Sequence, residues 1–565
     1  MVASLGVRSR GAASTLADPA ADSIDFYIFD AWRANGITPA PRTTDWEFIR
    51  RVTLDLTGRI PTPDRVLQFV ADADPAKRTK LIDELLARTE WVDKWTMYFG
   101  DLFRNSAMKP STALIRGADG RNAFYQWTRD SLVTGKPYNQ MATELITPAG
   151  SPSYLNGPIN FLIGGVLRGF PMQDTVDQMT ANVFTTFLGI GHVNCLLCHN
   201  GRGHLDGISL WGSTTTRYQA WQLASFLSHT QATGGNLSWG LVDDSKGFNV
   251  DYPLNSTDGN RPPRQPGADC APGDACNNVA PQYVFNGDSP QPGERYRVAL
   301  ARNITGDPQF ARALVNYLWA EFFGRGLVDP PDLFDPARLD PHNPPPAPWT
   351  LQPSNPRLLY ALAQHFVDSG YQLKSLMREM VNSETYQLSS RYDGQWDPAW
   401  EPYFARKFVR RLWAEEVHDA IGQSTGTLPA YEIGFPAKIS YAMQFPEPYA
   451  MPLYDGDARS FLDSFLRGNR DDQLRRQDGS ILQALALMNS PFVDAHLRTD
   501  AALLAKPDSE LALTLFVNVL SRYPSDAEAA KAAASLADAG VSGRAAAVQD
   551  LVWSLFNRVD FIFNY

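Results

Sequence analysis

The chain has 565 residues, of which 44% are hydrophobic and 20% are charged. This length exceeds one ordinary domain and predicts roughly two to four. The composition is that of a globular protein with enough apolar material for packed cores. A formal net charge of −10 does not indicate a basic face for nucleic acid, so no nucleic-acid partner is expected. No apolar run reaches the roughly 18 residues of a membrane span, which predicts that the chain has no transmembrane segment.

The first part of the chain predicts a flexible tail followed by a multi-helical domain. Residues 1–21 are rich in Ala, Ser and Gly and are expected to form the tail. Residues 22–230 show apolar spacing typical of helices. Thr62 and Pro63 have the residue types of an N-cap and a first helical position. Helices are expected over residues 24–32, 46–56, from 63 onward, 75–86, 91–103, 124–133, 138–146, 174–188 and 218–227.

The second part predicts an irregular connection and then another multi-helical domain. Residues 231–295 are dominated by Gly, Pro, Asn and Asp and are expected to form a linker segment without regular structure. Helical spacing returns over residues 296–565, so the fold class is mainly α with long Pro/Gly-rich connections. Helices are expected over residues 310–323, 358–369, 373–383 and 404–421, and a solvent-facing hairpin is expected around residues 527–539.

The sequence Cys195–Leu196–Leu197–Cys198–His199 forms a Cys-x-x-Cys-His motif. Positions i, i+3 and i+4 of a helical turn share a face, so Cys195, Cys198 and His199 can point the same way. Two thiols on one face can add to the two vinyl groups of haem, while the imidazole of His199 binds the iron as proximal ligand. The motif therefore predicts one covalently attached haem c.

Three other interpretations of the motif remain open. Cys195 and Cys198 can form a redox or structural disulfide, with His199 incidental. They can bind zinc together with His199 or His204, although zinc fingers place a longer loop between the cysteine pair and the histidines. They can also be two buried thiols without a cofactor.

The ligand on the second axial position of the iron is not fixed by the motif. His204 follows His199 by only five residues, which leaves little chain to reach the other face of the haem. His229 and Met179 lie on or beside flanking predicted helices, far enough along the chain to fold over the ring. We retain His204, His229 and Met179 as candidate distal ligands.

Two acidic clusters are interpreted as structural. Glu415, Glu416, His418 and Asp419 fall on one predicted helix, and without a second such helix they indicate a solvated helix face rather than a metal site. A further set is expected to form turns and caps around nearby prolines, because its spacing matches no EF-hand. Its members are Asp329, Asp332, Asp335 and Asp340.

Several stretches of the chain resemble a pair of domains found together in secreted bacterial proteins. Residues 48–62, 187–189 and 224–227 resemble the Planctomycete-type cytochrome domain. Residues 310–319, 323–330 and 484–491 resemble its usual partner, the Planctomycete-specific domain.

This resemblance implies export and a presumed c-type haem, and it brings no established activity. Members of the first family often follow the motif with an acidic residue and His-Pro. Here residues 200–206 intervene, and His204 would be the displaced counterpart of that second histidine.

Haem is attached to cysteines outside the cytoplasm, so we expect a periplasmic, cell-surface or secreted protein whose signal peptide has been removed. Export also favours a disulfide between Cys270 and Cys276 around the turn-forming residues 271–275. The expected function is electron transfer with a redox partner protein or a cell-surface assembly. A haem enzyme of peroxidase or oxidase type and a structural or binding surface protein are the alternatives.

Overall fold

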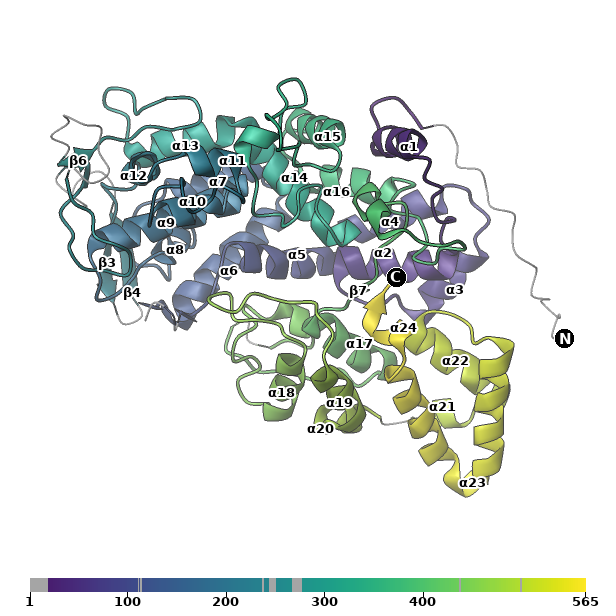
Figure 1. Ribbon diagram of the computed structural model, residues 1–565. Helices are drawn as coiled ribbons and strands as arrows, with labels where there is room; N and C mark the ends of the chain where they lie inside the picture. Colours follow the sequence, from purple (N-terminus) through teal and green to yellow (C-terminus); the bar gives the residue numbers. More distant parts are fainter. Residues whose placement is uncertain are drawn as a thin grey trace.

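The computed structural model describes residues 19–109, 111, 114–235, 238–242, 250–266, 277–435, 438–497 and 500–565. Within these ranges helices dominate, and the named strands form only two-stranded antiparallel ribbons. The expected fold class, mainly α, is confirmed. Figure 1 shows α5 and α6 along the middle of the molecule, with α9 to their left, α13–α16 above them and α17–α24 below.

The helices before the strand-containing segment are α1 (Ile24–Asn35), α2 (Asp45–Thr57), α3 (Pro63–Ala71), α4 (Lys77–Ala87), α5 (Thr89–Leu102), α6 (Gly117–Val133), α7 (Tyr138–Ile146), α8 (Ile159–Ile163), α9 (Met172–Leu188), α10 (His192–Leu196), α11 (Leu210–Thr214) and α12 (Arg217–Ser225). The ribbons pair β1 (Met108–Lys109) with β2 (Leu114–Ile115), β3 (Gln231–Gly235) with β4 (Ser238–Val242), β5 (Tyr252–Pro253) with β6 (Asn278–Val279), and β7 (Arg410–Arg411) with β8 (Phe563–Asn564).

The later helices are α13 (Tyr296–Gly306), α14 (Pro308–Phe323), α15 (Pro356–Asp368), α16 (Leu373–Asn382), α17 (Ala414–Thr425), α18 (Gly456–Ser464), α19 (Ile481–Asn489), α20 (Pro491–His496), α21 (Ala501–Leu504), α22 (Asp508–Leu520), α23 (Asp526–Phe556) and α24 (Val559–Ile562). Short 3₁₀ turns cover Pro336–Arg338, Pro398–Tyr403 and Ala442–Gln444.

Local chemistry explains where several helices begin and end. Thr44 and Glu47 form a capping box at the start of α2, and Gly58 ends this helix in the left-handed conformation at φ 65°. The expected N-cap at Thr62 and first position at Pro63 are confirmed for α3.

Two expectations differ from the structure. The helix expected over residues 404–421 begins only at Ala414, because the chain before it is extended and pairs as β7 with β8 at the C-terminus. The Ala-rich stretch expected as a hairpin is the first arm of α23, which bends back at Gly540 (φ 58°, ψ −169°). Glycine tolerates this conformation, so the helix reverses there.

The hydrophobic residues form two cores that divide the chain differently from the expected domains. One core extends from Ile24 to Ala405, with Val517 added from α22. The other extends from Leu412 to Phe561 and includes three residues of the first part, Leu54, Ile60 and Met97. The chain therefore continues through one core across residue 296, the expected start of the second domain.

Residues 250–266 of the expected linker segment are hydrogen-bonded to helix α9. Arg264 is fully buried and donates hydrogen bonds to Asp174 and Asp177 of α9, each at 2.6 Å. The hydroxyl of Tyr252 donates to Asp177 at 2.8 Å. Residues 250–266 thus pack against α9. Cys270 and Cys276, the expected disulfide pair, lie outside the described residues.

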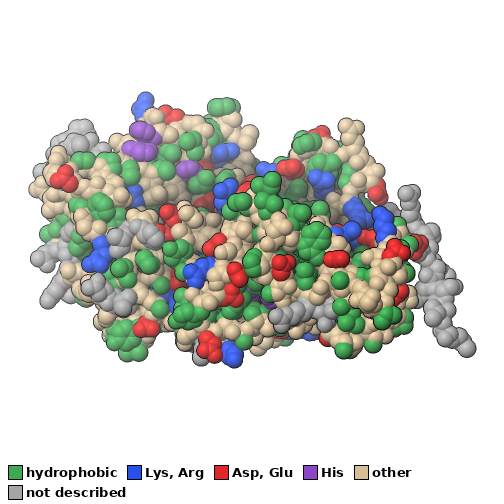
Figure 2. Space-filling view, turned by 90° about the horizontal axis from the view of Figure 1, so that it is seen from below, with side chains coloured by type: hydrophobic (Ala, Val, Ile, Leu, Met, Phe, Trp, Pro, Cys, Tyr) green, Lys and Arg blue, Asp and Glu red, His purple; other side chains and the backbone are tan. Residues whose placement is uncertain are grey.

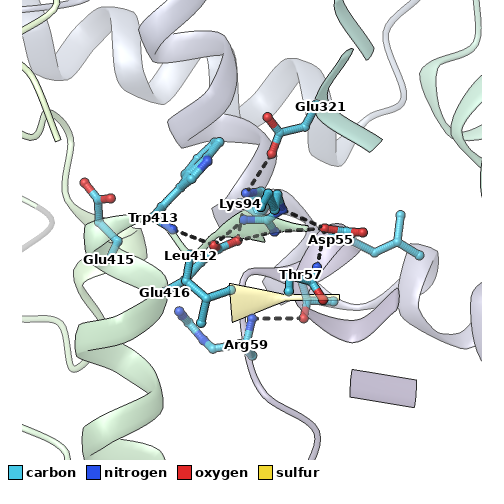
Figure 3. Close-up of polar contacts among 12 residues, drawn as sticks. Asp55, Thr57, Arg59, Lys94, Glu321, Leu412, Trp413, Glu415 and Glu416 are labelled. Carbon is cyan, nitrogen blue, oxygen red and sulfur yellow. Dashed lines mark hydrogen bonds and ion pairs between the residues drawn. The ribbon is translucent and has the colours of Figure 1, made fainter. Parts of the chain in front are cut away.

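The two cores meet at a buried network of charges (Figure 3). The guanidinium of Arg410 donates to both carboxylate oxygens of Glu416, at 2.7 and 3.0 Å, and to Asp55 of α2 at 2.8 Å. Lys94 of α5 donates to Glu416 at 3.0 Å and to Glu321 of α14 at 3.3 Å. Glu321 is 10% exposed, and the other side chains here are at most 3% exposed. The network therefore joins α2, α5 and α14 to α17.

The solvated face expected for the acidic residues of α17 is therefore wrong. These residues, Glu415, Glu416, His418 and Asp419, are at most 1% exposed. Asp419 accepts hydrogen bonds from the backbone amides of Ala442 and Met443 at 2.6 and 3.1 Å. The spacing along one helix does not reveal that other helices supply cations and amides for these carboxylates.

We expect Glu416→Gln to destabilise the protein by about 3–5 kcal/mol, because the neutral amide removes the carboxylate that Arg410 and Lys94 share and leaves this buried cluster with excess positive charge. Urea unfolding measures the loss. The control is Asp83→Asn, which removes the exposed ion pair between Asp83 and Arg378 and should cost less than about 1 kcal/mol. Equal effects of the two substitutions would contradict the assigned role of the network.

Two buried lysines predict a rise of stability with pH. Burial lowers the pKa of Lys407 and of Lys109 to about 7. An unfolded lysine titrates near about 10.4, so between these values the unfolded chain binds protons that the folded chain does not. The free energy of unfolding should therefore rise from pH 7 towards 10, by up to about 1.4 kcal/mol per pH unit and lysine. Urea titrations at several pH values test this, and an unchanged slope in the Lys109→Met, Lys407→Met double variant would refute it.

Candidate functional site

The Cys-x-x-Cys-His motif lies at the end of α10, directly after the long helix α9. Gly189 ends α9 at φ 66° and lets the chain turn into α10. Beyond α10, the amides of Cys198 and His199 donate to the carbonyl of Cys195 at 3.0 and 3.3 Å. The helical turn thus continues through the motif, which brings Cys195, Cys198 and His199 onto one face.

Both cysteines of the motif are half-buried and neither forms a disulfide. Burial raises the pKa of the Cys195 thiol, so its protonated form is favoured. The alternative in which Cys195 and Cys198 form a disulfide is not realised in this structure.

The hydrogen bond of His199 fixes which of its nitrogens is available. Nδ1 lies 2.9 Å from the carbonyl oxygen of Asn200. A carbonyl only accepts, so Nδ1 carries a proton, and in the neutral ring Nε2 is then the nitrogen with the lone pair. Histidines that bind metals commonly donate their other ring nitrogen to such a carbonyl. His199 is therefore in the tautomer that a proximal ligand requires.

Two arginines from outside the motif hold it in place. Arg261 donates to the sulfur of Cys198 at 3.2 Å and to the side chain and carbonyl of Asn194 at 2.7 and 3.1 Å. Arg217 of α12 donates to the carbonyls of Leu197 and Pro262 at 3.2 and 2.7 Å. The motif is thus tied to residues 250–266. Sequence reasoning missed both arginines, because no spacing rule links them to the cysteines.

The candidate distal ligands have different surroundings. The ring of His204 stacks on that of His199, with centroids 4.0 Å apart and planes at 29°. His229 stacks on Tyr296 at 4.1 Å. Met179 is fully buried in α9, where its backbone and Cγ contact Gly165 so closely that a Cβ on that glycine would clash. Of the three candidates, only His204 contacts His199, and it stacks on the face of that ring. Distal ligation by any of the three stays a prediction.

The zinc interpretation of the motif and the expected role of the acidic residues near Pro336 have different outcomes. Across the described parts of the chain, no three side chains of His, Cys, Asp or Glu come together in a geometry that would hold a metal ion, so the zinc interpretation gains no support. Asp335 caps α11 by accepting from the amides of Leu210 and Trp211 at 2.7 and 3.0 Å. Its expected role as a cap residue is confirmed.

In protein made without haem attachment, iodoacetamide should label Cys198 faster than Cys195. The thiolate is the reactive form, and burial raises the pKa of Cys195. Peptide mass spectrometry after timed labelling gives the two rates. In denaturant the difference should vanish. Faster labelling of Cys195 in the folded protein would show that the site is built differently.

Comparison with known protein families supports the resemblance seen in the sequence. Residues 23–210 match the family model described as PSCyt2, protein of unknown function (DUF1549). Residues 296–536 match the one described as PSD1, protein of unknown function (DUF1553). No curated protein and no solved structure matches the chain. The motif lies inside the first matched range, and the two matches follow the expected order. The chain thus belongs to the proteins that carry the Planctomycete cytochrome domain PSCyt2 followed by the Planctomycete-specific domain PSD1, both of unknown function.

Proposed function

We propose that the PSCyt2 domain carries one haem c, attached through Cys195 and Cys198 with His199 as proximal ligand. The observation that carries this proposal is the state of His199, whose Nδ1 is engaged by the Asn200 carbonyl while Nε2 remains available. Two free thiols on the same face of the same turn complete the donor set. These groups fit the chemistry of covalent haem attachment.

Each residue then has a defined task. Cys195 and Cys198 form thioether bonds that retain haem where a free cofactor would be lost, and His199 binds the iron. The bound haem supplies reversible one-electron chemistry. Arg261 holds Cys198 and Asn194 and brings a positive charge close to the site.

The most economical function for this arrangement is electron transfer with a redox partner protein or within a periplasmic or cell-surface assembly. Among the described residues no helix is both long enough and apolar enough to cross a membrane. On the face shown in Figure 2, acidic and basic side chains are interspersed among hydrophobic ones. A transient partner can dock on a mixed surface of this kind.

A haem enzyme of peroxidase or oxidase type is the second candidate. It requires an open position on the iron and an acid–base group near it. His204 favours this candidate because it lies against His199 instead of across from it and so leaves the opposite iron face without this imidazole. An acid–base group for that face would have to come from another part of the chain.

Haem attachment is tested in a host with c-type cytochrome maturation. We expect the protein band to keep its haem-peroxidase stain after denaturing electrophoresis. The Cys195→Ser, Cys198→Ser double variant should lose the stain, since no thioether anchor remains. The matched control is the Cys270→Ser, Cys276→Ser double variant, which changes two cysteines outside the motif and should stain like the wild type. An unstained wild-type band would refute the proposal.

The absorption spectrum separates the carrier from the enzyme. A six-coordinate, low-spin spectrum that carbon monoxide does not change is expected for electron transfer. A high-spin spectrum that shifts with carbon monoxide or peroxide would instead establish the enzyme. His204→Ala decides whether His204 takes part, because it should change the spin state only if this imidazole is a ligand.

A further inference from the structure

A groove follows one face of α6, far along the chain from the haem motif. It consists of two adjoining hollows of about 790 and 690 Å³. Both are lined by Ala123, Gln126 and Tyr154, so the two hollows share a wall. The lining extends along α6 from Ala118 to Thr134, a span of about 24 Å at 1.5 Å per residue. A groove of this length suits a chain-like ligand better than a compact one.

Polar side chains form a row along the groove. Asp119, Asn122, Gln126 and Asp130 line it at intervals of three or four residues and therefore lie on one face of α6. Gln126 donates to Asp130 at 2.7 Å, and Asn122 accepts from Arg121 at 2.9 Å. The remaining N–H groups and lone pairs of these side chains offer hydrogen-bond donors and acceptors along the helix.

Aromatic and aliphatic side chains form the other part of the lining. Tyr154 and Tyr449 are 45% and 42% exposed, and Leu453 is 41% exposed. Phe435 and Trp127 are half-buried and contribute further ring surface. Large exposed apolar side chains gathered around a hollow indicate a binding surface.

The charges of the groove exclude anionic ligands. Its two cations are already paired: Arg121 with Glu447, and Lys136 with Glu144 at 2.6 Å. Asp119 and Asp130 make no ion pair within the described part of the chain. The groove therefore carries an excess of negative charge, which repels sulfated or uronic polymers and nucleic acids.

We propose that this groove binds a neutral oligosaccharide chain. Sugar rings present apolar C–H faces that stack on tyrosine and tryptophan, and hydroxyl edges that hydrogen-bond to carboxylates and amides. A chain with both properties matches the polar row and the aromatic lining together. An apolar peptide face would bury the carboxylate of Asp119 without a partner, which is unfavourable.

The groove is built by both matched domains. The α6 side and Tyr154 belong to the PSCyt2 match, whereas Phe435, Glu447 and Tyr449 belong to the PSD1 match. The buried pair Arg121–Glu447 joins the two sides at the groove. Glycan binding would therefore need both domains in one chain, and it does not depend on haem attachment.

Affinity electrophoresis of the full chain in native gels tests the proposal. The gels contain neutral polymers (hydroxyethyl cellulose, glucomannan, arabinoxylan or soluble starch) or anionic ones (alginate or chondroitin sulfate). At least one neutral polymer should retard the protein, and the anionic ones should not. Tyr154→Ala and Tyr449→Ala should each weaken the retardation about two- to tenfold, the range expected for one aromatic contact.

The matched control is Tyr360→Ala, which removes a tyrosine that is 51% exposed on α15, outside this groove. It should bind like the wild type, and equal urea midpoints should show that all three variants are folded. Lack of retardation by every neutral polymer would overturn the proposal. Retardation by the anionic polymers, or unchanged binding of Tyr154→Ala and Tyr449→Ala, would overturn it as well.

Discussion

The constraint on which this structure depends is the burial of charge between Arg410, Glu416, Lys94 and Asp55. Removing such charges from water is costly, and the cost is recovered only when every partner is in place. Asp55 and Lys94 come from the PSCyt2 match, and Arg410 and Glu416 come from the PSD1 match. Neither domain can leave the other without exposing or isolating these charges. The two domains therefore form one structural unit.

This buried charge network also accounts for the extent of the two hydrophobic cores, whose boundary does not coincide with the boundary between the two matched families. Phe310 of α14 stacks on Tyr138 of α7, with ring centroids 5.1 Å apart. The first helices of the PSD1 match thus complete the core that contains the Cys-x-x-Cys-His motif, and its later helices build the second core. The groove on α6 also combines both domains, and the buried pair Arg121–Glu447 joins its two sides.

The sequence was sufficient for features encoded by neighbouring residues. Helix α7 has the bounds expected from its apolar spacing, and Pro63 begins α3 as expected. The cysteine motif was recognisable because its chemistry requires a fixed spacing. Features created by distant contacts were missed: Glu416 looks like a surface residue in the sequence because its partner Lys94 lies 322 positions earlier in the chain. Arg261 donates to Cys198 but follows it by 63 positions in the sequence, and helical or strand periodicity does not link residues that far apart.

The chain around His204 limits what this imidazole can do. A Cβ at Gly201 would lie 1.6 Å from the carbonyl oxygen of Gly212, so the backbone is held tightly there. Leu205 is only 4% exposed and fixes the other side of His204. His204 can therefore rotate its ring, but it can cross to the opposite face of a haem on His199 only if Gly201 and Leu205 both leave their contacts. Under the proposed function, Cys195, Cys198 and His199 would hold the haem, and a further ligand to its iron would have to come from another part of the chain or from outside it. A further iron ligand from the chain would make the protein an electron carrier, whereas one from outside the chain would make it a haem enzyme.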